Sequence, residues 1–262
     1  MVKSIFVSPL QLEGIENSGA NHLIAVNKGL DRNIWAKLMK LKVDLAISTN
    51  AFGLDGCPAN PQSKKKLLSK IDDALKFQPK EIWIDHFRFD GHWEAIDGNK
   101  IPGIHPQCEF CVGKVRANIL KDIALEVIKT VSGKAKIGYF AVPFTNDEVT
   151  ELVTGLGQDH PVIGKIFDMS SPMLYQQMIK KPPSYISQYI KWLSSKTKRP
   201  VLPIIQVKSM PDDLKDTISE DIITSEFQEA IKDPSIGVCF FWWVHALEKN
   251  KTEVIKKLFS ST

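Results

Sequence analysis

The stretch that decides the fold is Lys80-Glu81-Ile82-Trp83-Ile84-Asp85-His86-Phe87-Arg88-Phe89-Asp90-Gly91-His92-Trp93-Glu94. It begins with the pattern of a buried strand and ends in ionisable and aromatic residues. In an alternating strand, Ile82 and Ile84 face one side, where they suit packing against helices, and Asp85 faces the other side. A carboxylate at the last residue of such a strand is typical of the mouth of an α/β barrel, where barrel enzymes keep their chemistry. The alternative is a structural Asp85 that caps a helix or pairs with Arg88.

The bulk composition is that of a soluble globular protein. The 262 residues are a typical size for a single (β/α)₈ barrel, and we expect one domain over residues 1–262. Hydrophobic residues make up 43% of the chain and charged residues 24%, as in soluble domains. The net charge is only +4 and the chain has no basic stripe that could follow phosphates, so we expect no nucleic-acid partner.

The N-terminal residues and the cysteines bear on location. The apolar run within residues 1–7 is too short for a signal peptide and predicts a first strand. No apolar segment approaches the roughly 20 residues needed to cross a bilayer. We therefore expect no membrane partner and a cytoplasmic protein, unless a signal segment once preceded this sequence. Four cysteines in a chain of this length do not form a disulfide scaffold.

Strand patterns and helix patterns alternate along the chain. We expect eight strands, at residues 4–8, 22–26, 43–48, 80–85, 137–142, 166–175, 201–206 and 236–243. Apolar residues at helical spacing predict helices around residues 35–39, 67–75, 120–131, 185–193, 222–231 and 254–259. Thr145 with Glu148 three residues later predicts a capping box that opens a further helix. Such alternation predicts a parallel sheet with right-handed crossovers.

A barrel explains this pattern better than a doubly wound nucleotide-binding sheet does. No Gly-x-Gly-x-x-Gly follows any strand, and the sequence holds no phosphate-cradling Gly-Lys-Ser/Thr run. We therefore predict an α/β fold, a (β/α)₈ TIM barrel. The second strand, at residues 22–26, is short, and its failure would leave the barrel irregular or incomplete.

The strand ends of a barrel meet at one mouth, and here they supply a chemistry that suits a sugar. They collect one carboxylate, an arginine, amides, phenols and indoles; aromatic faces stack on pyranose C–H faces while polar groups bind the hydroxyls. Trp242 and Trp243 are adjacent, so only one of them can face the mouth, and core packing is the alternative for each. The strand-end residues are Ser8, Asn50, Asp85, His86, Arg88, Tyr139, Met173, Tyr175, Gln206, Trp242 and Trp243.

Two segments resemble a set of glycoside-hydrolase-like TIM barrels. Residues 82–89, followed by Cys108-Glu109-Phe110-Cys111, are similar to the Asp-x-x-Arg-Phe/Tyr pattern after the fourth strand of that set and to its Cys-rich segment before the next helix. Ser171-Pro172-Met173-Leu174-Tyr175 is similar to the Pro-Met-x-Tyr of its sixth strand, and Met-x-Tyr also resembles chitinase-like barrels. Residues 84–88 match the nucleophile strand of amylomaltase-type glucanotransferases locally, with Trp83 in place of an Arg. The resemblance spans roughly residues 80–245.

The resemblance implies carboxylate chemistry centred on Asp85, as nucleophile or as acid/base, with Arg88 and His86 orienting it or holding substrate hydroxyls. Glycoside cleavage normally takes two carboxylates, about 5–5.5 Å apart for retention and about 6.5–9.5 Å apart for inversion. Strand seven ends in Gln206, where many retaining barrels place a Glu, so the second carboxylate is not marked by a strand end. We take Asp90 as the second catalytic candidate. Other nearby carboxylates are Glu94, Asp147, Glu148 and Glu248.

A cysteine pair after strand four raises the question of a metal. Cys-x₂-Cys supplies two ligands from one turn, and a histidine or third cysteine could complete a tetrahedral zinc site. The alternatives are ordinary buried thiols or a redox-labile pair, because a second Cys-x₂-Cys is missing. We expect no cofactor; the candidate ligands for a structural zinc, which would pin the long loop beside the fourth strand, are Cys57, His105, Cys108 and Cys111.

The sequence favours a glycoside hydrolase that acts on a glycan or other small molecule at the barrel mouth. The substrate-binding candidates are His86, Arg88, Asn50, Tyr139, Tyr175, Gln206, Trp242 and Trp243. Two alternatives stay open. One is a carbohydrate-binding TIM barrel without catalysis, favoured by the missing second carboxylate, and the other is a metal-dependent hydrolase that uses the His and Cys residues of 86–111. The sugar, the linkage and the oligomeric state are not encoded in these patterns.

Overall fold

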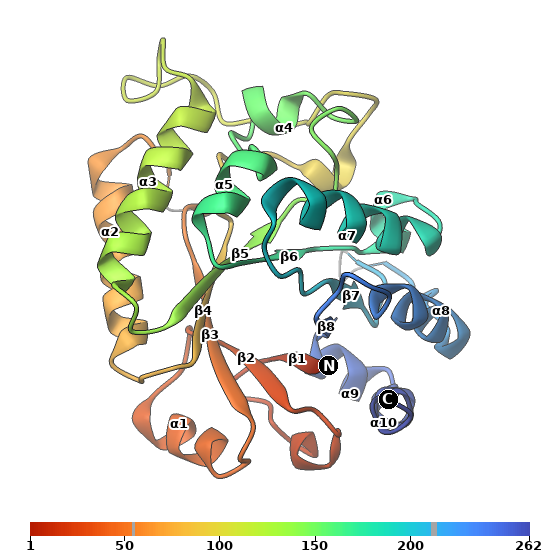
Figure 1. Cartoon of the computed structure of the whole chain (residues 1–262). Coiled ribbons are helices and arrows are strands. Elements are labelled where there is room, and N and C mark those ends of the chain that lie inside the picture. The colour runs from red at the N-terminus through yellow and green to blue at the C-terminus, as the bar shows by residue number, and fades with distance from the viewer. Residues whose placement is uncertain (54–55, 211–213) are drawn as a thin grey trace.

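The fold is a barrel of parallel strands surrounded by helices, as Figure 1 shows for a computed structural model of the chain that describes residues 1–53, 56–210 and 214–262. The strands form one sheet in the order β6-β5-β4-β3-β2-β1-β8-β7. The two outermost strands meet through isolated parallel bridges, Ser170 with Val201 and Met173 with Ile204, which nearly close the sheet. The predicted (β/α)₈ TIM barrel is confirmed.

Strand two, the weak point of the sequence pattern, forms at the residues expected of it. β2 pairs in parallel with β1 on one side and with β3 on the other. The strands are β1 (Val2–Val7), β2 (His22–Val26), β3 (Asp44–Asn50), β4 (Glu81–Asp85), β5 (Lys136–Ala141), β6 (Met169–Pro172), β7 (Ile204–Gln206) and β8 (Gly237–Phe241).

Several helices begin at a residue whose side chain caps the first turn. Asp31 and Ser219 each accept a hydrogen bond from a backbone N–H of the first turn, and Asn60 does so in front of Pro61, which suits the first helical position. The helices are α1 (Arg32–Met39), α2 (Pro61–Leu75), α3 (Arg116–Val131), α4 (Glu151–Thr154), α5 (His160–Ile166), α6 (Gln176–Ile179), α7 (Ser184–Thr197), α8 (Glu220–Ala230), α9 (Trp243–Glu248) and α10 (Thr252–Ser260).

Alternation along the strands divides the core into two parts. Ile82 and Ile84 of β4 lie in the outer part, between sheet and helices, and Trp83 lies inside the barrel. The indole of Trp83 stacks on Phe140 at 5.6 Å between ring centroids. It fits because its partner on β5 is Gly138, where an added Cβ would come within 2.5 Å of the indole ring. The barrel interior is therefore packed with side chains up to the level of its mouth.

Three local predictions need correction. Thr145 and Glu148 form the reciprocal hydrogen bonds of a capping box, at 2.9 and 3.2 Å, but they close a turn, and α4 begins only at Glu151. Strand six occupies only Met169–Pro172 of the expected range 166–175, because α5 runs to Ile166 on one side and the chain turns into α6 at Gln176 on the other. Strand eight ends at Phe241, and Trp243 begins α9. Within the described ranges, no helix combines the length and apolar character needed to cross a bilayer.

Candidate active site

Asp85 lies at the carboxyl end of β4, on the face that points into the barrel mouth. Its side chain is 32% exposed, and Oδ1 accepts a hydrogen bond of 2.8 Å from the backbone N–H of His86. His86 adopts a left-handed conformation with φ of 49°, which turns the chain at the strand end, and its Nδ1 lies 3.3 Å from the same oxygen. Asn50 pairs with Asp85 in the sheet register, and its Nδ2 lies 3.4 Å from the imidazole.

The environment of Asp85 favours its ionised form. Burial raises the pKa of the Asp85 carboxyl, but the hydrogen bonds and charge of His86, together with the charge of Arg88, outweigh it and hold the pKa below its ordinary value. The Asp85 side chain is therefore a carboxylate at neutral pH, ready to act as a nucleophile, a base or an electrostatic partner for a cation.

Arg88 is a buried cation that organises the loop after β4. Its Nη1 donates to the carbonyl oxygen of Gly91 at 3.0 Å and to that of Phe89 at 3.3 Å. Burial lowers the pKa of Arg88, and the charges of Asp85, Asp90 and Glu94 oppose that effect. The guanidinium thus stands among three carboxylates, and its contacts are with the protein backbone.

A group of aromatic rings lies at the barrel mouth, and one of them, Tyr175, is within the electrostatic reach of Asp85. Tyr175 lies 5.5 Å from Phe241 and 6.5 Å from Trp93 between ring centroids, and Phe241 stacks on Trp242 at 5.8 Å. Phe6 lies 5.3 Å from Phe241, which adds a fifth ring from β1. These five rings, Phe6, Trp93, Tyr175, Phe241 and Trp242, are called the aromatic wall below.

The phenol of Tyr175 and two unsatisfied polar atoms give the mouth hydrogen-bonding capacity. Burial raises the pKa of Tyr175 well above its ordinary value, and the charge of Asp85 raises it further, so the phenol keeps its proton. Nε1 of Trp242 and Oε1 of Gln206 are buried and have no hydrogen-bonding partner among the described residues. Nε2 of Gln206 donates to the carbonyl oxygen of Lys208 at 2.8 Å. A bound polar ligand could supply the missing partners.

Two sequence candidates lie away from the mouth. Tyr139 is fully buried outside the barrel, where its hydroxyl lies 3.3 Å from Nδ1 of His160 and its ring stacks against the same histidine. Trp243 is 1% exposed in the outer core, and its Nε1 donates to the carbonyl oxygen of Glu13 at 2.8 Å. The structure therefore brings neither residue to Asp85, whereas it does bring Asn50, His86, Tyr175, Gln206 and Trp242 to the strand ends.

Asp90 and the other carboxylates are engaged in local contacts. Asp90 is exposed, and its Oδ1 accepts from the backbone N–H of Gly91 at 3.0 Å. Glu94 lies 3.2 Å from His92, Glu148 closes the capping box, and Glu248 lies 3.5 Å from Lys208. The charges of Asp90, Glu94 and Asp85 all act on Arg88. Asp90 and Glu94 are therefore the carboxylates that the loop after β4 brings near the Arg88 guanidinium together with Asp85.

Three rings of the aromatic wall were missed by the sequence reasoning. Trp93 lies in the short 3₁₀ turn Trp93–Ala95. The sequence around it has no helical or strand periodicity that would predict where its side chain points. Phe6 and Phe241 occupy inner positions, and the register of Phe241 against Gln206 is what fixes its side. Alternation groups Phe241 with Cys239, but the sequence does not show which of the two faces of β8 points inward.

Three cysteines and a histidine form a second cluster, made by a residue ahead of α2 and by the segment between β4 and α3. One ligand atom from each of Cys57, His105, Cys108 and Cys111 falls within 4.8 Å of the other three. It is the sole grouping of at least three potential metal ligands within residues 1–53, 56–210 and 214–262. The structure thus brings together the four metal ligands that the sequence suggested. His86 and His92 are not part of this cluster, and they contact Asp85 and Glu94 respectively.

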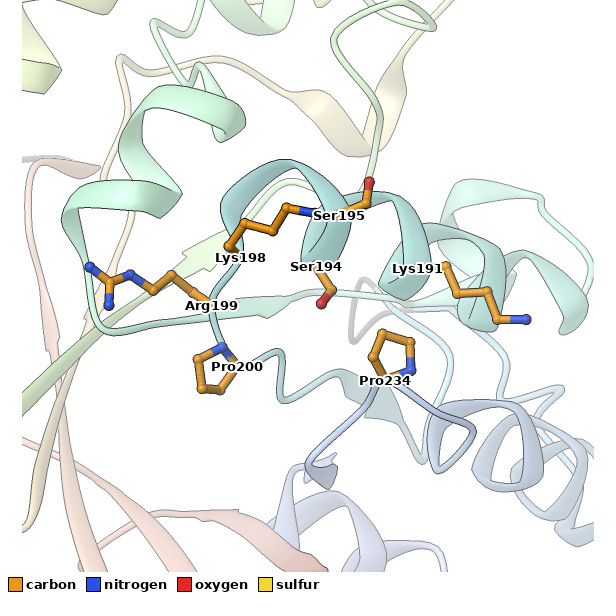
Figure 2. Close-up of a pocket in the computed structure, with 7 residues that line it drawn as sticks. All are labelled: Lys191, Ser194, Ser195, Lys198, Arg199, Pro200 and Pro234. Carbon is orange, nitrogen blue, oxygen red and sulfur yellow. The ribbon is translucent and has the colours of Figure 1, made fainter.

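The hollow in Figure 2 lies at the opposite end of the barrel. It measures about 460 Å³ and is lined by the end of α7 and by Pro200 and Pro234, which precede β7 and β8. Figure 2 shows Lys191 and Arg199 directed to opposite sides, so these cations do not converge on one ligand position. Barrel enzymes place their chemistry at the carboxyl ends of the strands, and this hollow is therefore no candidate active site.

Comparison with solved structures shows a likeness of fold to barrels that are described as glycoside hydrolases. It is similar to the PgaB (BpsB) glycoside hydrolase domain from Bordetella bronchiseptica, with 10% identity, 99% of both chains covered and a TM-score of 0.69. It is also similar to a GH18 chitinase from Cycas revoluta, with 8% identity over 99% of this chain and 100% of the other, at a TM-score of 0.63. A GH2 beta-galacturonidase from Eisenbergiella tayi shares 11% identity over 100% of this chain and 51% of its own, at a TM-score of 0.62.

Sequence comparisons return nothing comparable. No family model matches the chain, and no curated protein matches it. At identities near 10% the likeness to solved structures establishes the barrel fold, and the expected resemblance to glycoside-hydrolase barrels is confirmed at that level. The short motifs that suggested the resemblance stay predictions.

Proposed function

We propose that the protein is a glycoside hydrolase that cleaves a glycan bound at the barrel mouth, with Asp85 as the first catalytic carboxylate. The observation that carries the proposal is the ionised Asp85 together with the aromatic wall at the carboxyl ends of the strands. The solved structures of similar fold that are described as glycoside hydrolases support the same function.

Each group has a role in such a reaction. Asp85, whose pKa is held low, suits attack on the anomeric carbon or stabilisation of the oxocarbenium-like transition state. Asp90 would protonate the leaving oxygen as its bond to the anomeric carbon breaks, while Asp85 either bonds to that carbon or stabilises its positive charge. Asp90 would then take a proton from the incoming water as the water oxygen bonds to the anomeric carbon, and any bond from that carbon to Asp85 breaks. Tyr175 would donate a hydrogen bond to the substrate or to Asp85, and Trp242 would stack on a sugar face. Arg88 and His86 would hold Asp85 in place.

A carbohydrate-binding barrel without catalysis is the second candidate, and the surroundings of Asp90 favour it. Oδ1 of Asp90 is occupied by the Gly91 N–H, and the end of β7 carries Gln206 in place of a carboxylate. The aromatic wall and the unsatisfied atoms of Trp242 and Gln206 would serve binding equally well. The metal-dependent hydrolase is not proposed, because the cysteine cluster offers four protein ligands and so leaves no open metal position for a water.

A panel of glycans and aryl glycosides, applied to the wild type and to Asp85→Asn, tests the proposal. The amide keeps the shape of the side chain and removes its charge, and we expect turnover to fall by about 10²–10⁴-fold with unchanged folding. Asp73→Asn is the matched control, because Asp73 lies on the exposed surface of α2 beside Lys76. Glycan binding without turnover in all three proteins would favour the binding barrel, and an equal loss in both variants would overturn the role of Asp85.

A further inference from the structure

We propose that Cys57, His105, Cys108 and Cys111 bind one structural zinc ion that fastens the loop between β3 and α2 to the long excursion between β4 and α3. The four ligand atoms come from two segments that are 48 residues apart at their nearest members, and they lie within 4.8 Å of one another. The proposal does not depend on the reaction at Asp85.

The spacing of the sulfur atoms fits a metal better than it fits a disulfide. Sγ of Cys108 and Sγ of Cys111 lie 3.6 Å apart, and the four cysteines are free thiols in the structure. Zinc–sulfur bonds of about 2.3 Å in a tetrahedron place two sulfur atoms about 3.8 Å apart, whereas a disulfide needs about 2.05 Å. The cluster therefore already has the geometry into which a zinc ion fits.

His105 supplies an independent sign of a missing partner. Its Nε2 is buried and makes no hydrogen bond with any described residue. A buried imidazole nitrogen without a partner costs free energy, and a metal coordinated by that nitrogen would remove the cost; the His105 ring already lies close enough to the Cys108 thiol to lower its pKa. The backbone N–H of Cys108 donates to Sγ of Cys111 at 3.3 Å, which is the kind of second-layer contact that orients a metal-bound thiolate.

The donor set identifies the metal. Three thiolates and one imidazole in a compact group are a common structural set for Zn²⁺, and hard cations such as Mg²⁺ and Ca²⁺ prefer oxygen donors. Cys57 and Cys111 are 5% and 2% exposed, so the ion would be shielded from solvent. All four tetrahedral positions are filled by the protein, which assigns the ion a structural role.

The proposed zinc ion would stabilise the loop that follows Asp85. The backbone N–H of His105 donates to the carbonyl oxygen of Asp90 at 2.9 Å, and the guanidinium of Arg116 lies 4.7 Å from the ring centroid of Phe89. A metal on His105 would therefore hold Asp90 and its neighbours through the backbone. Loss of the metal would loosen this loop while the barrel strands keep their ladder.

Metal content tests the assignment. The full chain, produced and purified without chelator, is measured by elemental mass spectrometry, and one zinc per chain is expected. Cys57→Ser and His105→Ala each remove one ligand, and we expect zinc to fall to less than half an equivalent in both. Cys239→Ser is the matched control, because Cys239 is buried inside the barrel and outside the cluster, and this variant should keep its full equivalent.

A second measurement covers variants that fail to fold. Wild-type protein is stripped with a chelator under reducing conditions and titrated with zinc chloride; binding of one equivalent should protect Cys57, Cys108 and Cys111 from alkylation and leave Cys239 unaffected. Zinc below a tenth of an equivalent with no uptake on titration would overturn the proposal. So would a different metal at full stoichiometry, a Cys108–Cys111 disulfide in the freshly purified chain, or a Cys57→Ser variant that retains all of its zinc.

Discussion

At Asp85, burial and hydrogen bonding act in opposite directions on one carboxyl group. His86→Ala removes the imidazole and leaves the backbone N–H, so burial meets less opposition and the pKa of Asp85 should rise. Carbon-13 NMR titration of the Asp85 carboxyl measures this directly. His92→Ala is the matched control, because the His92 ring contacts Glu94 instead. An unchanged pKa in His86→Ala would show that the backbone N–H of residue 86 and the charge of Arg88 are enough to hold the pKa of Asp85 low.

Glu226 is a buried carboxyl group to which no charged group of the described residues is paired. It is 1% exposed on the inner face of α8, its Oε2 has no hydrogen-bonding partner among the described residues, and burial raises its pKa to about 8. The folded state therefore binds a proton that the unfolded chain releases near its ordinary pKa, and stability falls as the pH rises from about 4.5 to about 8. Glu226→Gln should remove this dependence and stabilise the fold by about 1–3 kcal/mol at pH 8.

The neighbouring Glu229 makes the control for this prediction. Contacts with Lys232 and Ser187 lower its pKa, so its contribution to stability is present above the ordinary pKa of glutamate and is lost as the pH falls through the lowered value. Glu229→Gln should therefore destabilise the protein at neutral pH, opposite in sign to Glu226→Gln. Urea denaturation at pH 5 and at pH 8 measures both, and a parallel response of the two variants would refute the assignment for Glu226.

At the scale of elements, a buried ion pair joins Lys251, which precedes α10, to Asp216, which precedes α8. Nζ of Lys251 donates to Oδ2 of Asp216 at 2.6 Å and to the carbonyl oxygen of Val207 at 2.7 Å, and both charged side chains are nearly buried. Lys251→Met leaves Asp216 charged and without its cation, which should cost about 3–5 kcal/mol in free energy of unfolding. Lys256→Met, which removes an exposed pair with Glu253, should cost less than about 1 kcal/mol. Equal losses in urea denaturation would contradict the account.

The sequence specified elements wherever local chemistry and burial agree. β2 forms at residues 22–26 because its apolar residues are buried on both faces of the sheet, in the outer core and in the barrel interior. The pair Thr145 and Glu148 made the predicted reciprocal hydrogen bonds but no helix, since such a pair can also close a single turn. Short helices such as α5 were not predicted, because seven residues are too few to show a helical periodicity.

The composition of the candidate site was harder to predict than the barrel. A residue at a strand end is readable from sequence, and Asp85 and Gln206 end β4 and β7 as that rule expects, whereas Tyr175 lies three residues beyond the end of β6. Which neighbours turn inward depends on the direction of the chain after the last strand hydrogen bond, and this placed Trp242 inside and Trp243 outside. Contacts between distant segments, such as Cys57 with Cys108, depend on loop paths for which the sequence has no periodic signal.

At the scale of the whole molecule, the barrel is closed least firmly between β6 and β7. The other neighbouring strands share continuous ladders, whereas this seam is held by isolated bridges at Ser170 and Met173 and by backbone bonds such as Leu202 N–H to Ser170 O at 3.0 Å. Few hydrogen bonds need to break for the seam to open, so local opening there should cost less than global unfolding.

Hydrogen exchange measures this difference in opening. Amides of residues 170, 174 and 202, which donate across the seam, should exchange about 10–100-fold faster than those of β3 and β4, a difference of about 1.4–2.8 kcal/mol in opening free energy. Opening of this seam would move two residues of the proposed ligand site apart, because Tyr175 follows β6 and Gln206 ends β7. A ligand that bridges these residues at the mouth should therefore slow exchange at the seam more than at β3. Uniform protection around the barrel would show that it opens only as one unit.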